Sequence, residues 1–550
     1  MTDDFAARYG DLLTGSYDCV DRIVLNAYFT LGHNPGGFRV WWRRWHEDSD
    51  AELDNAHLMR MAGRFARRVK AWAGANGVPL IYCTAGQRKH LIAEEYLATH
   101  QVETGVFMVL AAKAPASVWE VSRTAAGVIR NLAKKRTFVN HYSFHIMDPE
   151  WGHVTIKMSG HPPFGTQVIL NGHEYAAARM RAAGVDFSKE GNCFTAVADP
   201  QFLARVAETF SQHASAGHLG QVCDRWIYSA CLCFGLDLAE QQRSGFRYTY
   251  SVYQVEYSRN LLFRVGGQME TLFDRVIDRT RARLDIPMLR TVFGTKDRPH
   301  RDRSGRSPTQ EIVIEKPRYG LTYFKALFGL LQVKAYTKGE HVLRFEATVH
   351  NTKALGIGRL LERFPAIVAR LGEITDRFAT VLDCVDTAFM PEPGFLDHLP
   401  APTVLGRTRT GGIDVNSPRI RAVLAAVTAL APAPGGFTTA DLVAKVHTMT
   451  GNTGYTTRQG AYDLRKLRGK ELIDKPGHAR RYQVTPQAAG TITTLLTLRD
   501  QVIGPILAGV RSPRLGRKPA AWTQIDRDYE TLRIGMQTLL HHLGLTPAAA

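Results

Sequence analysis

The chain has 550 residues, 45% of them hydrophobic and 22% charged, which predicts a globular protein of about three or four folding units and argues against large-scale disorder. Lys and Arg number 69 against 51 Asp and Glu, so the net charge of +18 favours an anionic partner, nucleic acid first and an acidic membrane surface second. No apolar run approaches the ~18 residues of a membrane span. The missing G-x-x-x-x-G-K-[ST] loop and G-x-S-x-G elbow argue against an NTP-driven motor and an α/β-hydrolase.

Cysteine usage and the first residues predict a protein of the reducing cytoplasm. The seven cysteines are scattered and odd in number, without zinc-ribbon spacing or a disulfide framework. The opening residues Met1–Asp4 are acidic and lack the basic-then-apolar order of a signal peptide. We therefore expect a cytoplasmic location and no membrane association.

Residues 1–130 predict a mixed α/β domain. The apolar strand Leu80–Cys83 is followed by the loop Gly86–His90 and by a helix over Leu91–Leu97. The loop could hold a phosphate at the helix N-terminus, although a lone glycine there is more often a turn. Earlier in the chain, Trp41–Trp45 is an aromatic and basic cluster that could stack on nucleic-acid bases or pack as part of a helix.

A histidine-rich β-hairpin is predicted within the next region, residues 131–390. Side chains alternate along Phe138–Ile146, and again along His153–Met158 after a turn at Asp148–Gly152. If the two strands pair, one face collects three histidines and three other polar side chains. These six residues are His141, Ser143, His145, His153, Thr155 and Lys157.

The histidine face predicts a site for a divalent metal or for a phosphate. Neutral imidazoles are common metal ligands, so the three histidines are the candidate ligands of Mg²⁺ or Mn²⁺. The candidate catalytic residues are His141, His145, His153, Lys157 and Glu174. Further carboxylates that could bind the metal are Asp148, Glu150 and Glu346. The alternative is a solvated sheet face whose polar residues merely alternate.

Two features of the sequence can be compared with those of replication proteins. Rolling-circle initiators and relaxases carry two strand histidines separated by one residue and a later tyrosine nucleophile, whereas His141 and His145 are separated by three. Tyr253 and Tyr257 would lie one helical turn apart, either as paired nucleophiles or as an ordinary helix stripe. The segment Lys334–Glu346, with its tyrosine, lysine and Leu-Arg-x-Glu strand, is similar to segments in some plasmid and phage replication proteins.

The chain becomes regular after a Pro- and Gly-rich stretch, residues 391–414, which predicts a linker. Three helices are then expected, the first opening at Ser417, the second over Thr439–Met449 and the third from near Thr456. Two short strands follow, Leu472–Ile473 and Arg480–Val484, and the basic turn between them predicts a β-wing.

Over residues 415–490, this order of three helices and a basic wing resembles the MarR-like winged-helix domains of bacterial regulators. The resemblance implies that the third helix enters the major groove of DNA and that the wing contacts phosphates. The residues it assigns to DNA are Arg458, Gln459, Arg465 and Lys466 on the helix, and His478, Arg480 and Arg481 on the wing. A protein–protein module is the alternative. Twenty Lys and Arg against nine Asp and Glu from residue 401 onward favour nucleic acid.

The sequence as a whole predicts a multidomain α+β protein that binds nucleic acid, DNA before RNA. The predicted parts are a mixed α/β domain (1–130), a central α+β domain (131–390), a linker (391–414), a winged helix (415–490) and a basic segment with a helix (491–550). We expect a DNA-processing or maintenance protein of a mobile element, which would be a metal-dependent nuclease or nickase if the histidine face is catalytic. The alternatives are a non-catalytic transcriptional regulator and a structured-RNA binder, the latter favoured by the Arg-rich stretch Arg279–Arg306. A helix over Asp526–Leu543 would pack on its own domain or on a second copy, so a homodimer is one of two expected arrangements.

Overall fold

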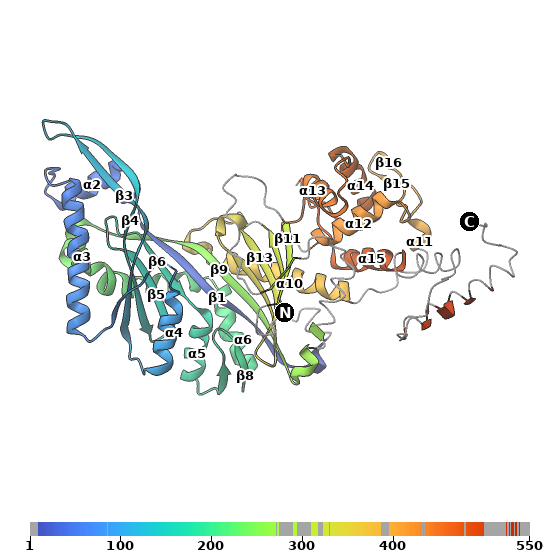
Figure 1. Ribbon diagram of the computed structural model, residues 1–550, viewed down its shortest axis with the longest axis horizontal. Coiled ribbons are helices and arrows are strands. Elements are labelled where there is room, and N and C mark those ends of the chain that lie inside the picture. Colours follow the sequence, from blue (N-terminus) through green and yellow to red (C-terminus); the bar gives the residue numbers. More distant parts are fainter. Residues whose placement is uncertain are drawn as a thin grey trace.

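The computed structural model describes residues 9–84, 86–270, 272–273, 330–386, 395–431, 433, 435–477 and 480–499, with three strands between residues 290 and 328 and scattered positions between 524 and 538. It contains many helices and one large sheet, which confirms the predicted α+β class. Figure 1 shows an elongated molecule, with the sheet at the left and centre and a helical unit at the right.

Twelve strands form this sheet, and they are antiparallel except where β2 pairs with β3 and β10 pairs with β11. In spatial order they are β10 (Arg290–Phe293), β11 (Gln310–Lys316), β12 (Tyr323–Phe328), β13 (Leu331–Lys338), β14 (Val342–Val349), β9 (Tyr248–Phe263), β1 (Leu13–Phe29), β6 (Thr166–Leu170), β5 (Gly152–Ser159), β4 (Ile129–Asp148), β3 (Gly105–Arg123) and β2 (Leu80–Tyr82). The long strands β1 and β9 pair along nearly their full length. They therefore join the two halves of the sheet.

The tyrosines of residues 248–257 lie on β9 and not on a helix, so the expected helical stripe of Tyr253 and Tyr257 is wrong. This segment alternates Tyr, Val and Ser with few strong helix formers, and such a composition suits a strand buried against neighbours on both sides. The hydroxyl of Tyr257 donates to Asp18 Oδ2 at 2.7 Å, and the ring is buried. Its position is that of a core residue.

Helices pack around the sheet, and several begin at side chains that accept a backbone N–H. The helices are α2 (Pro35–Trp45), α3 (Asn55–Ala75), α4 (Lys89–Thr99), α5 (Gly172–Ala182), α6 (Pro200–Glu208), α7 (Ala214–Trp226), α8 (Leu238–Ser244) and α10 (Phe364–Asp386). Asn34 caps α2 through Gly37 N at 2.6 Å, and Asp54 caps α3 through His57 N at 2.6 Å. A small second sheet, β7 (Phe187–Lys189) and β8 (Phe194–Val197), lies beside α5 and α6.

The three tryptophans of α2 are buried in the core, so the proposed stacking of Trp41–Trp45 on bases is wrong. Trp41 packs at 5.3 Å from Phe29 and at 5.2 Å from Phe38, ring centroid to centroid. Arg43 turns outward and pairs with Asp50 at 2.8 Å. The aromatic side chains of α2 therefore face the core and Arg43 faces the surface, as expected if this segment packs as part of a helix.

The sheet continues across the domain boundary that the sequence suggested at residue 130. Strands β3 and β4, which lie on either side of it, pair from Gly105 with Met147 to Arg123 with Ile129. One hydrophobic core extends from Tyr9 to Ala379 and also includes Ala429. Residues 1–130 and 131–390 therefore do not separate in the structure, because the strands on both sides of the boundary bury their apolar faces in the same core.

A second hydrophobic core lies in the C-terminal unit, residues 395–499. Its helices are α12 (Pro418–Leu430), α13 (Thr439–Thr450), α14 (Thr457–Gly469) and α15 (Pro486–Thr497). The first three match the predicted helices, and capping boxes at Thr438 and Thr456 set the starts of α13 and α14. Gly451, with φ of 68°, ends α13 in the left-handed conformation that glycine adopts without strain.

Two antiparallel bridges follow α14 where the wing was expected. Asp474 pairs with Gln483, and Tyr482 pairs with Phe437, which precedes α13. The chain segments around residues 437, 474 and 482 thus form a minimal three-stranded arrangement against the helices. It is shorter than the two predicted strands.

The predicted linker, residues 391–414, is largely a folded part of the C-terminal unit. It contains α11 (Phe395–His398) and the hairpin β15 (Thr403–Leu405) and β16 (Thr408–Thr410). Leu399 and Ile413 are buried in the second core, and Lys470 Nζ donates to the carbonyl of His398. The Pro and Gly content here serves tight turns, and the two apolar side chains fix the segment to the helices.

Six cysteines within the described residues are free thiols. In the same part of the chain, no helix is both long and apolar enough to cross a membrane. Most of the Arg-rich stretch Arg279–Arg306, apart from β10, and most of the expected helix Asp526–Leu543 lie outside the described residues.

Candidate functional site

The predicted histidine hairpin is present as β4 and β5. Ser143 lies opposite Lys157, His145 opposite Thr155, and Met147 opposite His153. Because side chains of opposed residues share a face, all six predicted polar residues project from one side of the sheet. The other side carries Phe144 and Ile156 into the hydrophobic core.

Two of the three histidines contact each other directly. Nδ1 of His145 and Nε2 of His153 are 2.9 Å apart, so one ring donates a hydrogen bond to the other. The ring of Phe107 lies 5.4 Å from His153 and 6.2 Å from His145. Burial lowers the pKa of His145 to about 3 and that of His153 to about 4, so both rings are neutral near pH 7.

The third histidine is separated from this pair. His141 lies four residues before His145 on an extended strand, about 13 Å away along the chain. Burial lowers its pKa, and the nearby cations of Lys89 and Lys157 add to that effect. Within the described residues, His141, His145 and His153 do not form a group whose ligand atoms all lie within 4.8 Å of one another.

The predicted carboxylates are bound to other partners. Asp148 Oδ2 accepts from Arg225 at 2.6 Å and from the Trp226 indole at 2.7 Å, which fixes the hairpin turn. Glu174 pairs with Lys189 beside the start of β5, close enough to His153 to interact with its charge. Glu150 is exposed, 3.5 Å from Arg225. These carboxylates stabilise the turn and α5, and they do not face the histidine pair as a ligand set.

Polar side chains continue from the hairpin across the sheet, and we call this row the polar strip. Ser143, Lys157, Gln167 and Asn26 oppose one another in turn across β4, β5, β6 and β1. Arg22, Glu256, Thr348 and Gln332 continue the row across β1, β9, β14 and β13. Gln167 Nε2 donates to Asn26 Oδ1 at 3.0 Å, which joins two of the strands.

The histidine end of the polar strip is cationic and incompletely hydrogen-bonded. Lys157 and Lys89, the latter at the start of α4, face the histidines, and burial lowers the pKa of both lysines. Among the described residues, His141 Nε2, Ser143 Oγ and His145 Nε2 have no hydrogen-bond partner although they are buried. Buried polar atoms without partners cost folding free energy, so this end of the strip has capacity for a ligand.

The far end of the polar strip holds a carboxylate pair. Glu346 accepts from Lys334 at 2.6 Å, from Tyr336 at 2.8 Å and from Thr348 at 2.9 Å. Lys334 and Arg344 hold the pKa of Glu346 well below its usual range, whereas burial and the charge of Glu346 raise the pKa of Glu256. Glu346 is therefore saturated by cationic partners, and Glu256 is the carboxylate with the higher proton affinity.

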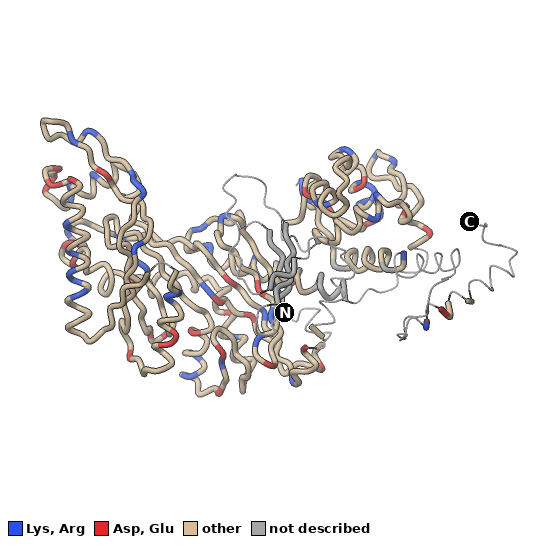
Figure 2. Tube along the Cα trace, viewed as in Figure 1, with Lys and Arg blue, Asp and Glu red and all other residues tan. Residues whose placement is uncertain are grey.

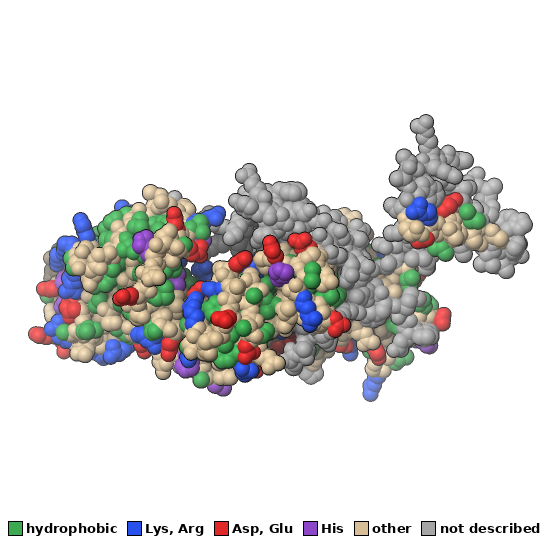
Figure 3. Space-filling model, turned by 90° about the horizontal axis from the view of Figure 1, so that it is seen from below, with side chains coloured by type: hydrophobic (Ala, Val, Ile, Leu, Met, Phe, Trp, Pro, Cys, Tyr) green, Lys and Arg blue, Asp and Glu red, His purple; other side chains and the backbone are tan. Residues whose placement is uncertain are grey.

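Figure 3 shows the molecule from below, where its surface is indented between its left and central parts and side chains of both charges lie along the edge.

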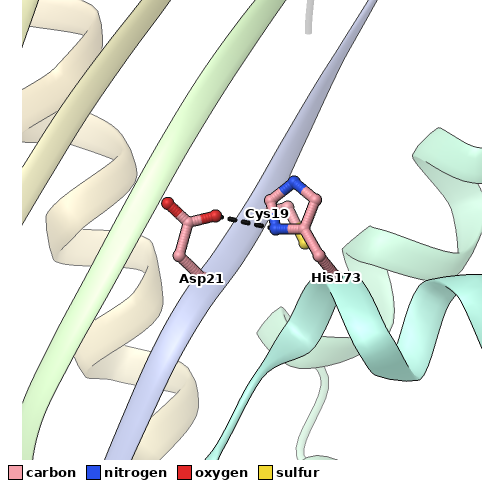
Figure 4. Close-up of side chains that lie close together, drawn as sticks. All are labelled: Cys19, Asp21 and His173. Atoms are coloured by element: carbon pink, nitrogen blue, oxygen red, sulfur yellow. Dashed lines mark ion pairs between the residues drawn. The ribbon is translucent and has the colours of Figure 1, made fainter. Parts of the chain in front are cut away.

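A different group contains the metal-ligand types that lie close together. Within the described residues, Cys19, Asp21 and His173 are the set of three whose ligand atoms all lie within 4.8 Å of one another. Figure 4 shows Asp21 and Cys19 on β1 and His173 at the start of α5, with His173 Nδ1 2.8 Å from Asp21 Oδ1. All three side chains are buried.

The surroundings of this group fit a structural network better than a metal ion. The guanidinium of Arg344, itself fully buried, contacts the other oxygen of Asp21, and Ser258 donates to Asp21 at 3.0 Å. Burial raises the pKa of the Cys19 thiol to about 12, so the sulfur keeps its proton. A metal at Asp21 Oδ1 would lie close to the Arg344 guanidinium on the other oxygen, and it would require Cys19 to lose its proton. The carboxylate already has its positive partner.

The third helix of the C-terminal unit presents a basic surface. Arg458, Arg465 and Arg468 of α14 are exposed, and Lys466 lies 5.1 Å from the ring centre of Tyr462. The one acid of α14, Asp463, is buried and accepts from Arg419 and from Tyr455, each at 3.0 Å. Figure 2 shows the positions of Lys and Arg along the chain of this unit, together with a smaller number of Asp and Glu positions. The exposed surface of α14 therefore carries cations without an opposing acid.

Two predicted DNA contacts have structural roles. Gln459 Oε1 accepts from the backbone N–H of Thr456 at 2.8 Å, so it completes the capping box of α14. Arg481 donates to the carbonyl of Gly436 at 3.0 Å, which ties the wing region to the turn before α13. Arg480 is exposed, and His478 lies outside the described residues.

Several residues of the polar strip and its neighbours escaped prediction from the sequence. Asp21, Glu256 and Cys19 stand in unremarkable strand segments, and their partners lie far away in the chain. Asp21 and Arg344 are more than 300 residues apart and meet only because β1, β9 and β14 are adjacent. The available signal was a run of charged residues, Asp18, Asp21 and Arg22, within a strand that is otherwise rich in apolar side chains.

Comparison with known proteins gives little help. No family model matches the chain, and no curated protein matches it. A solved structure of a rolling circle replication initiator protein from Geobacillus stearothermophilus is similar at 12% sequence identity, with a TM-score of 0.20, over 66% of this chain and 83% of that chain. So low a TM-score does not establish a shared fold. None of these matches is a MarR-like protein.

Proposed function

We propose that this protein binds duplex DNA through α14 and the wing region of its C-terminal unit. The observation that carries the proposal is the uncompensated charge of α14: three exposed arginines and Lys466 face outward while Asp463 is buried against Arg419. DNA carries a high density of phosphate charge, and cations on one face of a helix bind it by releasing counterions.

The arrangement of the unit supports an α14 that enters the major groove. Helices α13 and α14 are joined by a short turn, and antiparallel bridges follow α14, which is the order of a winged helix. With 13 residues, α14 is about 20 Å long, and a helix of ordinary diameter fits the major groove. Arg458, near its N-terminus, would reach bases, and Arg465 and Arg480 would reach phosphates.

The test is duplex binding measured as a function of salt. We expect Arg458→Ala and Arg465→Ala each to weaken binding, and each phosphate contact removed should lower the slope of log K against log salt by about 0.9. Lys353→Ala is the matched control, because it removes an exposed cation outside the C-terminal unit. Binding that is equally strong in the wild type and both arginine variants would refute the proposal and leave a protein–protein module.

A second function, the processing of a phosphodiester on the polar strip, is favoured by a separate observation. His141 Nε2, Ser143 Oγ and His145 Nε2 are buried without partners beside Lys89 and Lys157, which is a surrounding suited to a phosphate. Lysine neutralises charge, and the imidazole and hydroxyl donate hydrogen bonds to phosphate oxygens. The protein would then be a DNA-processing protein of a mobile element, with the C-terminal unit selecting the site.

Mg²⁺ or Mn²⁺ is a weaker expectation than phosphate at this end of the strip. Both ions prefer carboxylate oxygens, and Glu346 of the strip is already paired with Lys334, while burial and the charge of Glu346 raise the pKa of Glu256. We would incubate high-salt-purified protein with labelled single-stranded DNA, duplex DNA and RNA, in Mn²⁺ or in EDTA. Metal-dependent cleavage that His145→Ala abolishes would support a nuclease, and binding without cleavage would support a regulator. Tight binding to RNA alone would favour the RNA alternative, and a homodimer would be tested by sedimentation of the same sample.

A further inference from the structure

The hairpin of β3 and β4 extends beyond the sheet. Strand β2 contacts β3 at Leu80–Tyr82 with Val109–Ala111, and β5 contacts β4 from His141 onward. Residues 112–140 therefore form a two-stranded ribbon, which we call the arm, and Figure 1 shows it projecting from the left of the molecule.

The arm is held rigidly near its tip. The Trp119 indole is buried against Phe38 and donates to the carbonyl of Gly32 at 3.2 Å. The side chain of Asn55 pairs with both backbone groups of Val121, at 2.8 and 3.0 Å, and Arg123 donates to the carbonyl of Leu53 at 3.1 Å. A ribbon fixed in this way loses little conformational entropy when a ligand binds along it.

Cations without acids line one face of the arm. In the register of β3 and β4, Lys113 opposes Asn140, Pro115 opposes Phe138, Ser117 opposes Arg136, and Trp119 opposes Lys134. Opposed residues share a face, and this series contains three cations and no acid. Glu120 lies on the other face, where it pairs with Lys135 at 2.6 Å. Within the described part of the chain, no ion pair joins Lys113 or Arg136 to an acid.

Phe138 stands between these cations and is 70% exposed. A large aromatic ring in water is unfavourable, and a single exposed ring carries no meaning alone. Here the ring has Lys113 and Arg136 on its two sides along the ladder. An aromatic platform flanked by cations is the combination that binds single-stranded nucleic acid, since a base stacks on the ring and the adjacent phosphates contact the cations. Paired bases in a duplex are already stacked and do not offer that face.

We propose that the arm binds single-stranded DNA, with Phe138 stacking on a base and with Lys113 and Arg136 contacting phosphates. This inference deepens the proposed DNA-binding function by assigning a second polymer form to a surface far from α14. The arm would hold an unpaired segment while the C-terminal unit holds duplex.

The experiment measures binding of the full-length protein to labelled oligothymidylate and, in parallel, to duplex DNA. We expect Phe138→Ala to weaken single-strand binding about 5- to 150-fold, which corresponds to the loss of one stacked base, and to leave duplex binding unchanged. Phe138→Trp should retain the affinity because it keeps the aromatic face. A double variant, Lys113→Ala with Arg136→Ala, should lower the salt slope for single strands by about 1.4, or about 0.7 for each contact.

Lys135→Ala is the matched control, since it removes a neighbouring cation from the opposite face of the same strand. Phe138→Ala within about twofold of the wild type, or a loss in Lys135→Ala equal to that in the double variant, would overturn the inference. The two proposals fail separately: retention of duplex binding in the α14 variants would refute the proposal for the C-terminal unit alone, and retention of single-strand binding in Phe138→Ala would refute the proposal for the arm alone.

Discussion

Acid should destabilise the main fold through His145 by an amount that can be worked from its surroundings. The ring is 2% exposed, hydrogen-bonded to His153 and close to Lys157, and its pKa falls from 6.5 to about 3. Between these two values the unfolded chain binds a proton that the folded chain does not bind. Stability is therefore complete above about pH 6.5 and falls as the pH decreases toward the folded pKa.

A pH of about 5 lies about 1.5 units below the ordinary pKa of histidine, which the side chain has in the unfolded chain. Each pH unit corresponds to about 1.4 kcal/mol of unfolding free energy. His145 alone should then cost about 2 kcal/mol of unfolding free energy relative to about pH 8. Other buried histidines, among them His161 and His173, shift in the same direction, so the wild type should lose more than this. The difference between the wild type and His145→Gln isolates the one ring.

The assay is urea unfolding at about pH 8 and about pH 5, followed by far-UV circular dichroism, for the wild type, His145→Gln and His100→Gln. His100 is an exposed histidine at the end of α4, so its variant should follow the wild type at both pH values. We expect His145→Gln to lose about 2 kcal/mol less than the wild type between the two conditions. Equal losses in the wild type and His145→Gln would show that the ring is solvated in the folded protein, and the reasoning would fail.

Two further predictions concern buried charge and backbone packing. Asp21→Asn and Arg344→Met should each destabilise the fold by about 3–5 kcal/mol, because each leaves a buried partner uncompensated, and the double variant should cost clearly less than the sum. Urea unfolding of the four proteins measures this coupling, and additive costs would contradict it. Gly412→Ala should destabilise the C-terminal unit by about 1–3 kcal/mol, since the added carbon would lie 1.9 Å from the carbonyl oxygen of Pro400. Gly435→Ala should be near neutral, because no atom of the described residues beyond its chain neighbours lies within 4 Å of the added carbon. Thermal unfolding of the two variants measures this difference.

Local patterns predicted much of the fold. Strict alternation along residues 138–158 placed six polar side chains on one face, and the structure brings them to that face. Breaks in the pattern before Thr439 and before Thr456 predicted the starts of α13 and α14, and the structure has capping boxes at Thr438 and Thr456 that satisfy the free N–H groups of these helices. These signals lie within a few residues of the features they control.

Long-range pairing could not be read from the sequence. The strands β1, β9 and β14 are neighbours in space but come from residues 13–29, 248–263 and 342–349, so the contacts of Asp21 with Arg344 and of Glu256 with Glu346 have no local signature. Composition also misled in two places. The Pro- and Gly-rich stretch before residue 415 packs through Leu399 and Ile413, and the tyrosine-rich segment is a strand because its neighbours bury it on both sides.

The same electrostatic arrangement recurs at two separate surfaces, and this recurrence argues for one kind of ligand. On α14, Asp463 is neutralised by Arg419, and on the arm, Glu120 is neutralised by Lys135. In each case the acid is paired with one cation, and further cations remain without an ion pair to an acid among the described residues. Each surface therefore keeps a positive field that a polyanion can engage, and salt should weaken binding at both.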